Sequence, residues 1–440
     1  MIVTEKDTMI CENLKRRESG ELCFAGLELG PIAKKYGTPL YLYDEKRIRD
    51  RCRTYLSAVR EGFGAGARVM YASKAASFKR LYQIISEEGL GIDVVSRGEI
   101  HTANLAGFPL ENAYFHSNNK TDEDIEFAIS LGVGYFVVDN AEELYAIDRI
   151  AVSHGVRQKI LLRITPGIDP HTYAAVATGK VDSKFGSAIE TGQAEEITRL
   201  ALSFKNIELR GFHCHVGSQI FDADVYLATS RVMLTFIRDI ARRVGYFASE
   251  LDIGGGLGVR YIKEQPTIDI RATILTVAAE MKKLADELGI ELPKIALEPG
   301  RSIVADAGLT LYTVGTVKRI TGYKSYVSVD GGMTDNPRFA LYGSPYTILP
   351  VMGEVGSEYE VCSVVGRCCE SGDILQENVP MRADVKRGDL LACLTTGAYH
   401  YSMASNYNRI PRPPIVMIND GKTYLAVRRE TVDDLISLDI

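Results

Sequence analysis

Eight short apolar segments of strand type recur between residues 68 and 300, and helical segments separate them. Nearly continuous apolar strands that alternate with helices are typical of a parallel sheet covered by helices on its faces. Eight such units predict a (β/α)8 barrel, a fold of roughly 250 residues. The segments are "RVMYASKA" (68–75), "GIDVVS" (91–96), "AYFHSN" (113–118), "GYFVVDN" (134–140), "KILLRITP" (159–166), "LRGFHCHVGS" (209–218), "ELDIGGGLG" (250–258) and "PKIALEPG" (293–300).

The pattern changes after residue 301. Segments such as "LTLYTVGTVKRI", "EYEVCSVVGRCC" and "KTYLAVRRE" are β-rich, with turn residues between them and little helix. They predict an all-β second domain, a barrel or a sandwich. We expect the short extended stretches near the start, including "PLYLYDE", to join it. The predicted division is therefore an N-terminal segment (1–42) that belongs to the β domain, the barrel (43–303) and the C-terminal β domain (304–440).

Composition narrows the classes of partner. A net charge of −6 leaves no broad basic surface, which argues against nucleic acid and anionic membranes but leaves room for a local anion pocket. The N-terminus has no apolar stretch of signal-peptide type, and no segment approaches the roughly 20 apolar residues that span a bilayer. None of the eight cysteines belongs to a C-x-x-C pair. Reduced thiols in a cytoplasmic protein are the simplest interpretation.

Polar residues gather at the ends of the predicted strands, where barrel enzymes place their chemistry. Any one of them could be a structural residue, but seven strands at once predict a functional site. They are Lys74, Asp93, His116 with Asn118 and Asn119, Arg163, His213 with His215 and Ser218, the glycines 254–256, and Glu298 with Arg301.

Lys74 follows an apolar strand and is flanked by small residues in "YASKAAS". Partial desolvation would lower its pKa toward that of a usable amine nucleophile. The alternative is a surface lysine at the edge of a loop.

Two glycine-containing motifs suggest anion binding. In "DIGGGLG" (252–258), backbone N–H groups could approach a phosphate, although a barrel corner also uses glycine. In "EPGR" (298–301), the acid could keep a pyridine nitrogen protonated and the arginine could grip a phosphate or carboxylate. A surface ion pair is the other interpretation of this motif.

The motif "HCHVGS" (213–218) places His213 and His215 on one face of a strand, because alternate side chains of a strand share a face. His-x-His is a ligand pair of metal-dependent barrel hydrolases. Against a metal, the chain has only seven histidines and no matching acid-and-histidine set on other strands. The other interpretation is an imidazole stacked on a flat aromatic cofactor, with Ser218 as a hydrogen-bond donor.

A lysine, phosphate-cradling glycines, an acid for a ring nitrogen and a stacking histidine are the groups that pyridoxal 5'-phosphate requires. The sequence closely resembles the fold-type III pyridoxal-phosphate-dependent decarboxylases along nearly its whole length. That resemblance implies an alanine racemase-like barrel, a C-terminal β domain and bound pyridoxal phosphate. Its markers are "YASKA", "GIDVVSRGE", "FHSNNK", "TGKVDSKFG", "GFHCHVGSQ", "DIGGGLG", "EPGR", "DGGMTDNPRFALY", "CESGD" and "GAYHYSMASNYN". Two local departures, Arg97 and Ala76, fall on positions that are not catalytic in the family.

The resemblance implies roles at the cofactor. Lys74 would bond to it covalently, His215 would stack on its ring with Ser218 nearby, and Glu298 would pair with the ring nitrogen. Tyr399 would contact the cofactor or the substrate. The phosphate would be held by Gly255, Gly256 and the backbone of Glu298, Pro299, Gly300 and Arg301.

The resemblance also implies the substrate, meso-2,6-diaminopimelate, which would be converted to L-lysine and CO2 in the last step of lysine biosynthesis. Its far carboxylate would be bound by Arg301, Arg338 and Tyr342, and its far ammonium by Glu370. Cys369 would donate the proton after CO2 leaves. Cys369 and Glu370 would come from a second subunit, so a homodimer is implied. Adjacent Cys368 would be a packing residue, because side chains alternate in an extended segment.

Several alternatives remain at this stage. Pyridoxal-phosphate decarboxylases of this fold that act on ornithine usually carry aspartate after the cysteine and lack the arginine of "NPRFALY", but a few pocket contacts can redirect substrate choice. Decarboxylation of another amino acid such as ornithine or lysine, racemisation, a non-catalytic pyridoxal-phosphate carrier, and a metal-dependent hydrolase built on His213 and His215 are the rivals.

Overall fold

The computed structural model describes residues 10–168, 183–353 and 358–440. Within it the chain forms two compact units, one made of residues 51–258 and 267–300 and the other of residues 1–50, 259–266 and 301–440. Part of the marker "TGKVDSKFG" (residues 178–182) and the first nine residues of the predicted N-terminal segment lie outside the described residues. Each unit is described by itself.

The first unit is the predicted (β/α)8 barrel. Eight parallel strands follow the order β9-β11-β12-β13-β5-β6-β7-β8, and pairing of β8 with β9 closes the ring. A two-residue strand, β10 (Ser187–Ala188), adds to β9. The barrel strands are β5 (Arg68–Ala72), β6 (Gly91–Val94), β7 (Ala113–Phe115), β8 (Tyr135–Val138), β9 (Gln158–Thr165), β11 (Ile207–His213), β12 (Glu250–Asp252) and β13 (Lys294–Leu297).

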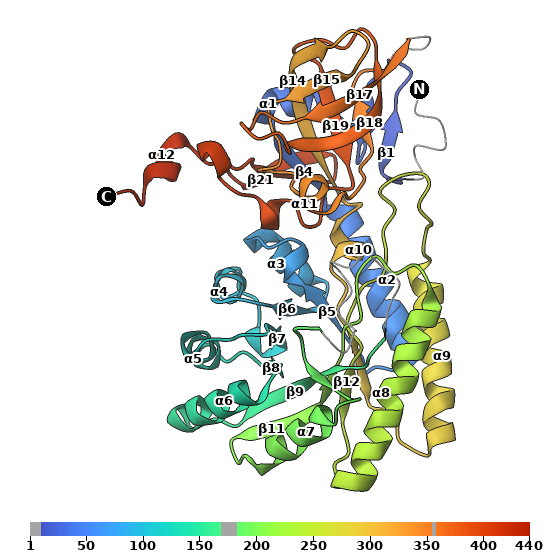
Figure 1. Cartoon of the computed structure of the whole chain (residues 1–440), viewed down its shortest axis with the longest axis vertical. Helices are drawn as coiled ribbons and strands as arrows, with labels where there is room; N and C mark the ends of the chain where they lie inside the picture. Colours follow the sequence, from blue (N-terminus) through green and yellow to red (C-terminus); the bar gives the residue numbers. More distant parts are fainter. Residues whose placement is uncertain (1–9, 169–182, 354–357) are drawn as a thin grey trace. The chain divides into compact units, whose positions relative to one another are not determined.

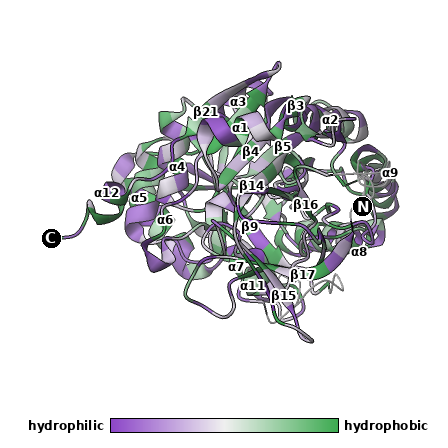
Figure 2. Ribbon diagram, turned by 90° about the horizontal axis from the view of Figure 1, so that it is seen from above, coloured by the Kyte–Doolittle hydropathy of each residue, from purple (hydrophilic) through white to green (hydrophobic). Residues whose placement is uncertain are grey.

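Helices cover the outside of these strands, as Figure 1 shows for the segment coloured from blue to yellow. Their ends follow ordinary capping rules: Thr121 and Asp124 form a capping box at the start of α5, and α9 ends at Gly289 with a left-handed φ of 67°. In Figure 2, helices such as α6 carry hydrophilic and hydrophobic residues side by side, as helices with one buried face do. The helices are α2 (Glu45–Phe63), α3 (Lys79–Glu87), α4 (Arg97–Leu105), α5 (Asp122–Ser130), α6 (Ala141–His154), α7 (Gln193–Ser203), α8 (Ala223–Val244) and α9 (Ile270–Leu288).

Inside the barrel, a buried cluster explains why these runs form strands. Met70, Tyr114, Tyr135, Leu161 and Ala296 belong to it and come from five different strands. Each is at most 4% exposed. Strands buried on both faces need apolar residues at nearly every position, which is the pattern seen in the sequence.

The second unit is β-rich, with a nine-stranded sheet that incorporates the N-terminal strand β4 between β14 and β20. The short strands β1 to β3 form a separate sheet of the same unit. Its strands are β1 (Leu14–Arg16), β2 (Leu22–Phe24), β3 (Leu27–Glu28), β4 (Leu40–Asp44), β14 (Gly308–Arg319), β15 (Ser325–Val329), β16 (Ile348–Pro350), β17 (Tyr359–Val365), β18 (Ile374–Arg382), β19 (Leu390–Leu394), β20 (Ile415–Asn419) and β21 (Lys422–Val427). Short helices are α1 (Leu29–Tyr36), α10 (Arg301–Val304), α11 (Arg338–Tyr342) and α12 (Val432–Ile436).

Two expectations about this unit are confirmed: the chain is sheet-rich after residue 301, and an N-terminal strand joins the same domain. Among the helices that the structure describes, none is both long and apolar enough to cross a membrane.

Candidate active site

The residues predicted at the strand ends of the barrel are brought together. Lys74 lies in a short 3-10 turn, η1 (Ser73–Ala75), directly after β5, and Asp93 lies in β6. His116 follows β7, His213 ends β11 and Glu298 follows β13. We call these five residues and His215 the barrel cluster. Burial raises the pKa of Asp93 and lowers that of His215, and the charge of Lys74 acts on both groups as well.

The partial desolvation predicted for Lys74 stays a prediction. The residue is exposed, whereas its neighbours Ser73 and Ala75 are buried. The 3-10 turn carries Lys74 past the end of β5 and out of the packed layer of strands. The side chain of Lys74 is therefore reachable from solvent.

Glu298 is the centre of the barrel cluster and is 7% exposed. Its Oε1 lies 2.6 Å from His116 Nε2, and its Oε2 lies 3.1 Å from His213 Nε2. Burial alone would raise the pKa of Glu298, but the two histidines outweigh burial and hold it well below its usual range. Both oxygens are thus engaged by rings, and the carboxylate stays ionised.

Two further carboxyl groups near Glu298, those of Asp252 and Asp93, have raised pKa values. Burial, and then the charge of Glu298, raises the pKa of Asp252 well above its ordinary value. Burial likewise raises the pKa of Asp93, against the opposing effect of His116. Asp252 Oδ1 accepts a hydrogen bond from the Gly254 amide at 2.7 Å. The site thus holds one carboxylate with a lowered pKa and two carboxyl groups with raised pKa values. Carboxyl groups whose pKa values are driven apart in this way can serve separately as base and acid.

The glycine run after β12 brings three loops into close approach. A Cβ on Gly255 would lie 2.0 Å from the Glu298 carbonyl oxygen, and Gly256 has a left-handed φ of 110°. The Gly255 amide donates to His215 Nδ1 at 3.3 Å, and Tyr226 Oη donates to the Gly255 carbonyl at 3.2 Å. Only glycine permits this packing, so the run is required by the backbone whatever it binds.

The backbone of residues 298–300 lies against the strand that leads to Lys74. The Ala72 amide donates to the Pro299 carbonyl at 3.1 Å, and a Cβ on Gly300 would lie 2.9 Å from Ala72 Cβ. Ser218, predicted near the cofactor, is half-buried five residues beyond the end of β11.

The histidine geometry does not favour the metal interpretation. β11 ends at His213, so the predicted strand pairing of His213 with His215 on one face is wrong. The group that could hold an ion is instead His116, His213 and Glu298, whose atoms lie within 4.8 Å of one another. Ligands of tetrahedral zinc are about 3.3 Å apart, given zinc–nitrogen distances of about 2.0 Å. The 2.6 Å between His116 Nε2 and Glu298 is a hydrogen bond.

The second unit holds the other predicted residues in an arginine cluster, which we define as Arg301, Arg338, Tyr261, Tyr346 and Tyr399. Arg301 Nη1 donates to Tyr261 Oη at 2.6 Å, and Arg338 Nε donates to Tyr346 Oη at 3.0 Å. The guanidinium carbons lie 4.6 Å and 5.4 Å from the centre of the Tyr399 ring. Tyr342, at 41% exposed, lies at the edge, with its ring centre 5.4 Å from Arg338.

This cluster is buried and positive. Arg301 and Arg338 are 5% and 6% exposed, which excludes the surface ion pair considered for "EPGR". Within the described ranges, no acidic side chain forms an ion pair with Arg338. Burial, and then the charge of Arg338, lowers the pKa of His400 to about 3. A buried guanidinium without an acid is strongly suited to an anionic ligand.

The turn at residues 367–373, which we call the cysteine turn, is bent rather than extended. The argument that alternation separates Cys368 from Cys369 is therefore wrong, because Asp373 Oδ2 accepts the Cys368 amide at 2.7 Å and folds the turn back. The two thiols still differ. Burial, and then Asp373, raises the pKa of Cys368 to about 12, whereas Cys369 and Glu370 are exposed.

The barrel cluster and the glycine run after β12 together fit pyridoxal phosphate on their chemistry. They offer an exposed lysine for the aldehyde, a carboxylate held ionised for a ring nitrogen, and a turn of glycines for the phosphate. The family model described as "Pyridoxal-dependent decarboxylase, pyridoxal binding domain" matches residues 45–305. The chain belongs to the pyridoxal-dependent decarboxylase family.

Relatives and solved structures agree with the family assignment. The chain is 43% identical to the diaminopimelate decarboxylase of Bacillus methanolicus, over 94% of this chain and 96% of that protein. Two crystal structures of diaminopimelate decarboxylase from M. jannaschii superpose with TM-scores of 0.91 and 0.90, at 32% identity and 98% coverage of both chains. The second is a co-complex with L-lysine.

Several residues of this decarboxylase chain were not identified from the sequence. Asp252 opens the "DIGGGLG" motif but was not singled out, and a buried acid before a glycine run was the available signal. Tyr261 and Tyr346 had none, because they lie 40 and 8 residues away from the arginines that they contact.

Proposed function

We propose that this chain decarboxylates meso-2,6-diaminopimelate to L-lysine and CO2, as a pyridoxal-phosphate-dependent carboxy-lyase of lysine biosynthesis. The observation that carries the substrate assignment is the arginine cluster. A diamine or a simple diamino monoacid has no second carboxylate that could pair with a buried guanidinium such as that of Arg338, whereas diaminopimelate has one. The names of the relatives point to the same substrate.

Bound pyridoxal phosphate supplies the electron sink for the negative charge left when CO2 departs. Lys74 would hold the cofactor through its amine, and the glycines 255 and 256 with residues 298–301 would bind its phosphate. Glu298, kept ionised by His116 and His213, would hold a proton on the cofactor's ring nitrogen. His215, whose Nδ1 accepts a hydrogen bond from the Gly255 amide, and Ser218 would hold the cofactor's ring.

The substrate's far end is held by charge complementarity. We assign its carboxylate to Arg301 and Arg338, with Tyr342 and Tyr399, and its ammonium to Glu370. Fixing a zwitterionic end at both charges orients the scissile carboxylate without any contact to it, which lets remote binding serve the chemical step.

Cys369 is the proposed proton donor: it is exposed, whereas burial and Asp373 raise the pKa of Cys368 to about 12. We further propose a homodimer in which Cys369 and Glu370 serve the partner's site. A cytoplasmic location is proposed because all eight cysteines are free thiols.

A substrate panel tests the assignment. The purified protein with pyridoxal phosphate should release CO2 from meso-diaminopimelate at least a hundredfold more efficiently than from L-lysine, L-ornithine or L-arginine. Borohydride should fix the cofactor to Lys74, and mass should show a dimer. Preference for ornithine or lysine would make the enzyme a diamine-producing decarboxylase. A requirement for a metal ion would favour the alternative of a metal-dependent hydrolase.

A further inference from the structure

The backbone amide of Cys369, in the cysteine turn, is bound by a side chain from outside the turn, that of Asn408. Asn408 Oδ1 accepts a hydrogen bond from the Cys369 amide at 2.8 Å. The neighbouring Cys368 amide is bound within the turn, by Asp373. The two adjacent cysteines thus have different anchors: Cys368 belongs to the turn's own framework, and Cys369 is tied to a segment 39 residues away.

Asn408 holds an unusual backbone conformation. It and Arg409 have φ angles of 54° and 57°, in the left-handed region. Asparagine visits this region with modest difficulty, but for arginine it is disfavoured. Two consecutive residues of this kind persist only where surrounding contacts hold them, and such strain gathers at functional sites.

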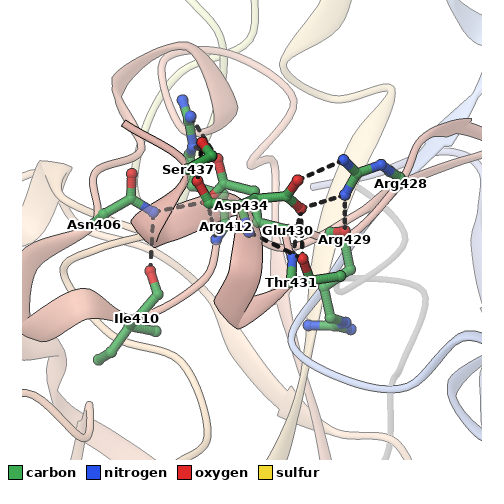
Figure 3. A network of polar contacts seen from close by, with 9 residues as sticks. All are labelled: Asn406, Ile410, Arg412, Arg428, Arg429, Glu430, Thr431, Asp434 and Ser437. Atoms are coloured by element: carbon green, nitrogen blue, oxygen red, sulfur yellow. Dashed lines mark hydrogen bonds and ion pairs between the residues drawn. The ribbon is translucent and has the colours of Figure 1, made fainter. Parts of the chain in front are cut away.

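The C-terminal segment supplies those contacts on both sides of Asn408. Before it, Asn406 Nδ2 donates to Glu430 Oε2 at 2.7 Å and to the Ile410 carbonyl at 3.1 Å (Figure 3). After it, Arg409 Nη1 donates to the Leu435 carbonyl at 2.8 Å, and Nη2 lies 3.0 Å from Asp439 Oδ2.

The C-terminal segment is itself fixed by charges. Glu430 also accepts from Arg412 Nε at 2.6 Å, and Asp434 caps α12 through Thr431 and pairs with Arg428 (Figure 3). Contacts with the C-terminal segment therefore fix the loop that carries Asn408, and Asn408 in turn accepts the hydrogen bond from the Cys369 amide.

We propose that Asn408 is a positioning residue for Cys369, and that Arg409 with the C-terminal segment holds it in place. This inference rests on the proposed role of Cys369 as proton donor. A thiol on an exposed turn delivers a proton well only if its backbone is fixed, and the Asn408 hydrogen bond fixes it at the reacting residue. Proton delivery, and not binding of the cofactor or the substrate, is the step that Asn408 supports.

The test uses holoenzyme carrying Asn408→Gly, which keeps the left-handed backbone and removes the acceptor. We expect kcat to fall about fivefold to tenfold, the scale of one hydrogen bond, with KM and the cofactor's absorbance spectrum unchanged. Asn408→Asp keeps an acceptor oxygen and should retain kcat within about twofold. Asn378→Gly is the matched control: Asn378 is an exposed asparagine with a left-handed φ of 55°, and its variant should behave as wild type.

A double-mutant cycle with Cys369→Ala decides the mechanism. If Asn408 acts through Cys369, Asn408→Gly causes no further loss of kcat in the Cys369→Ala background. Equal losses in both backgrounds, a change in KM alone, or an Asn408→Asp enzyme as slow as the Asn408→Gly enzyme would each overturn the inference. Wild-type kcat in Cys369→Ala would instead overturn the proposed role of the thiol, and the inference with it.

Discussion

Replacing Arg338 by methionine should damage substrate selection without damaging the fold. Arg338 is 6% exposed and uses Nε and Nη2 on Tyr346 and Ser344, at 3.0 Å and 3.3 Å. Its remaining N–H groups are those assigned to the substrate's far carboxylate. Two charge-assisted hydrogen bonds lost at about 1.5–2 kcal/mol each amount to about 3–4 kcal/mol, which lowers kcat/KM for meso-diaminopimelate about 10²- to 10³-fold.

The same substitution should leave stability unchanged or raise it. A buried charge that no acid in the described part of the chain neutralises is costly, and a methionine of similar length keeps most of the packing. We expect the free energy of unfolding to change by between 0 and about +2 kcal/mol.

The assay compares two substrates. L-lysine lacks the far carboxylate, so its low kcat/KM should stay within about threefold in Arg338→Met, and the preference for diaminopimelate should collapse. Arg149→Met, at an exposed ion pair with Asp122, is the control and should alter neither substrate. Equal losses on both substrates, together with a loss of more than about 2 kcal/mol in unfolding free energy, would refute the reasoning and make Arg338 structural.

Three further predictions concern single residues. Lys74→Ala should abolish decarboxylation and borohydride fixation of the cofactor, measured by CO2 release and peptide mass. Cys369→Ala should keep cofactor binding and slow turnover at least tenfold, whereas Cys368→Ala, with its thiol already held protonated, should keep wild-type kcat. Burial lowers the pKa of His213 from 6.5 to about 4, so the unfolded chain takes up a proton between these values that the folded chain does not. The free energy of unfolding should therefore fall by about 2 kcal/mol through this histidine between pH 7.5 and pH 5, measured by urea unfolding.

Each of these has its own contradicting result. A cofactor still fixed in Lys74→Ala would remove the lysine from its role, and equal slowing by both cysteine variants would return them to a structural interpretation. For the pH dependence, the control is His213→Asn, which keeps a hydrogen-bond donor for Glu298. In this variant the difference in the free energy of unfolding between pH 7.5 and pH 5 should be about 2 kcal/mol smaller than in the wild type. The same pH dependence in this variant would show that another group is responsible.

The eight barrel strands could be predicted because their signal is local. Strands buried on both faces must be apolar throughout, and each of the eight predicted segments overlaps one observed strand. Strand β18 was not expected, because "ILQENVPMR" carries polar residues and a proline. Its pairing with β17 is a tertiary outcome that no period in the segment shows.

The sequence predicted which residues lie at the barrel's strand ends, but not the contacts that they make with one another. The strand-end positions of Asp93, His116 and Glu298 followed from barrel topology, yet the pairing of Glu298 with two histidines did not. The bend at Cys368 depends on the Asp373 carboxylate, and Tyr261 depends on packing against Arg301. Such contacts depend on how the fold brings the side chains together, and the spacing of the residues along the chain does not show this.

The most direct test of the account is the product balance in D2O. Incubation with meso-diaminopimelate and pyridoxal phosphate should give one CO2 and one L-lysine per substrate, with a single deuterium on the carbon that lost its carboxylate. Exchange of the α-hydrogen without CO2 would make the enzyme a racemase. Preferential release of CO2 from a substrate without a second carboxylate would contradict the assignment of the arginine cluster, and D-lysine would contradict the proposed product.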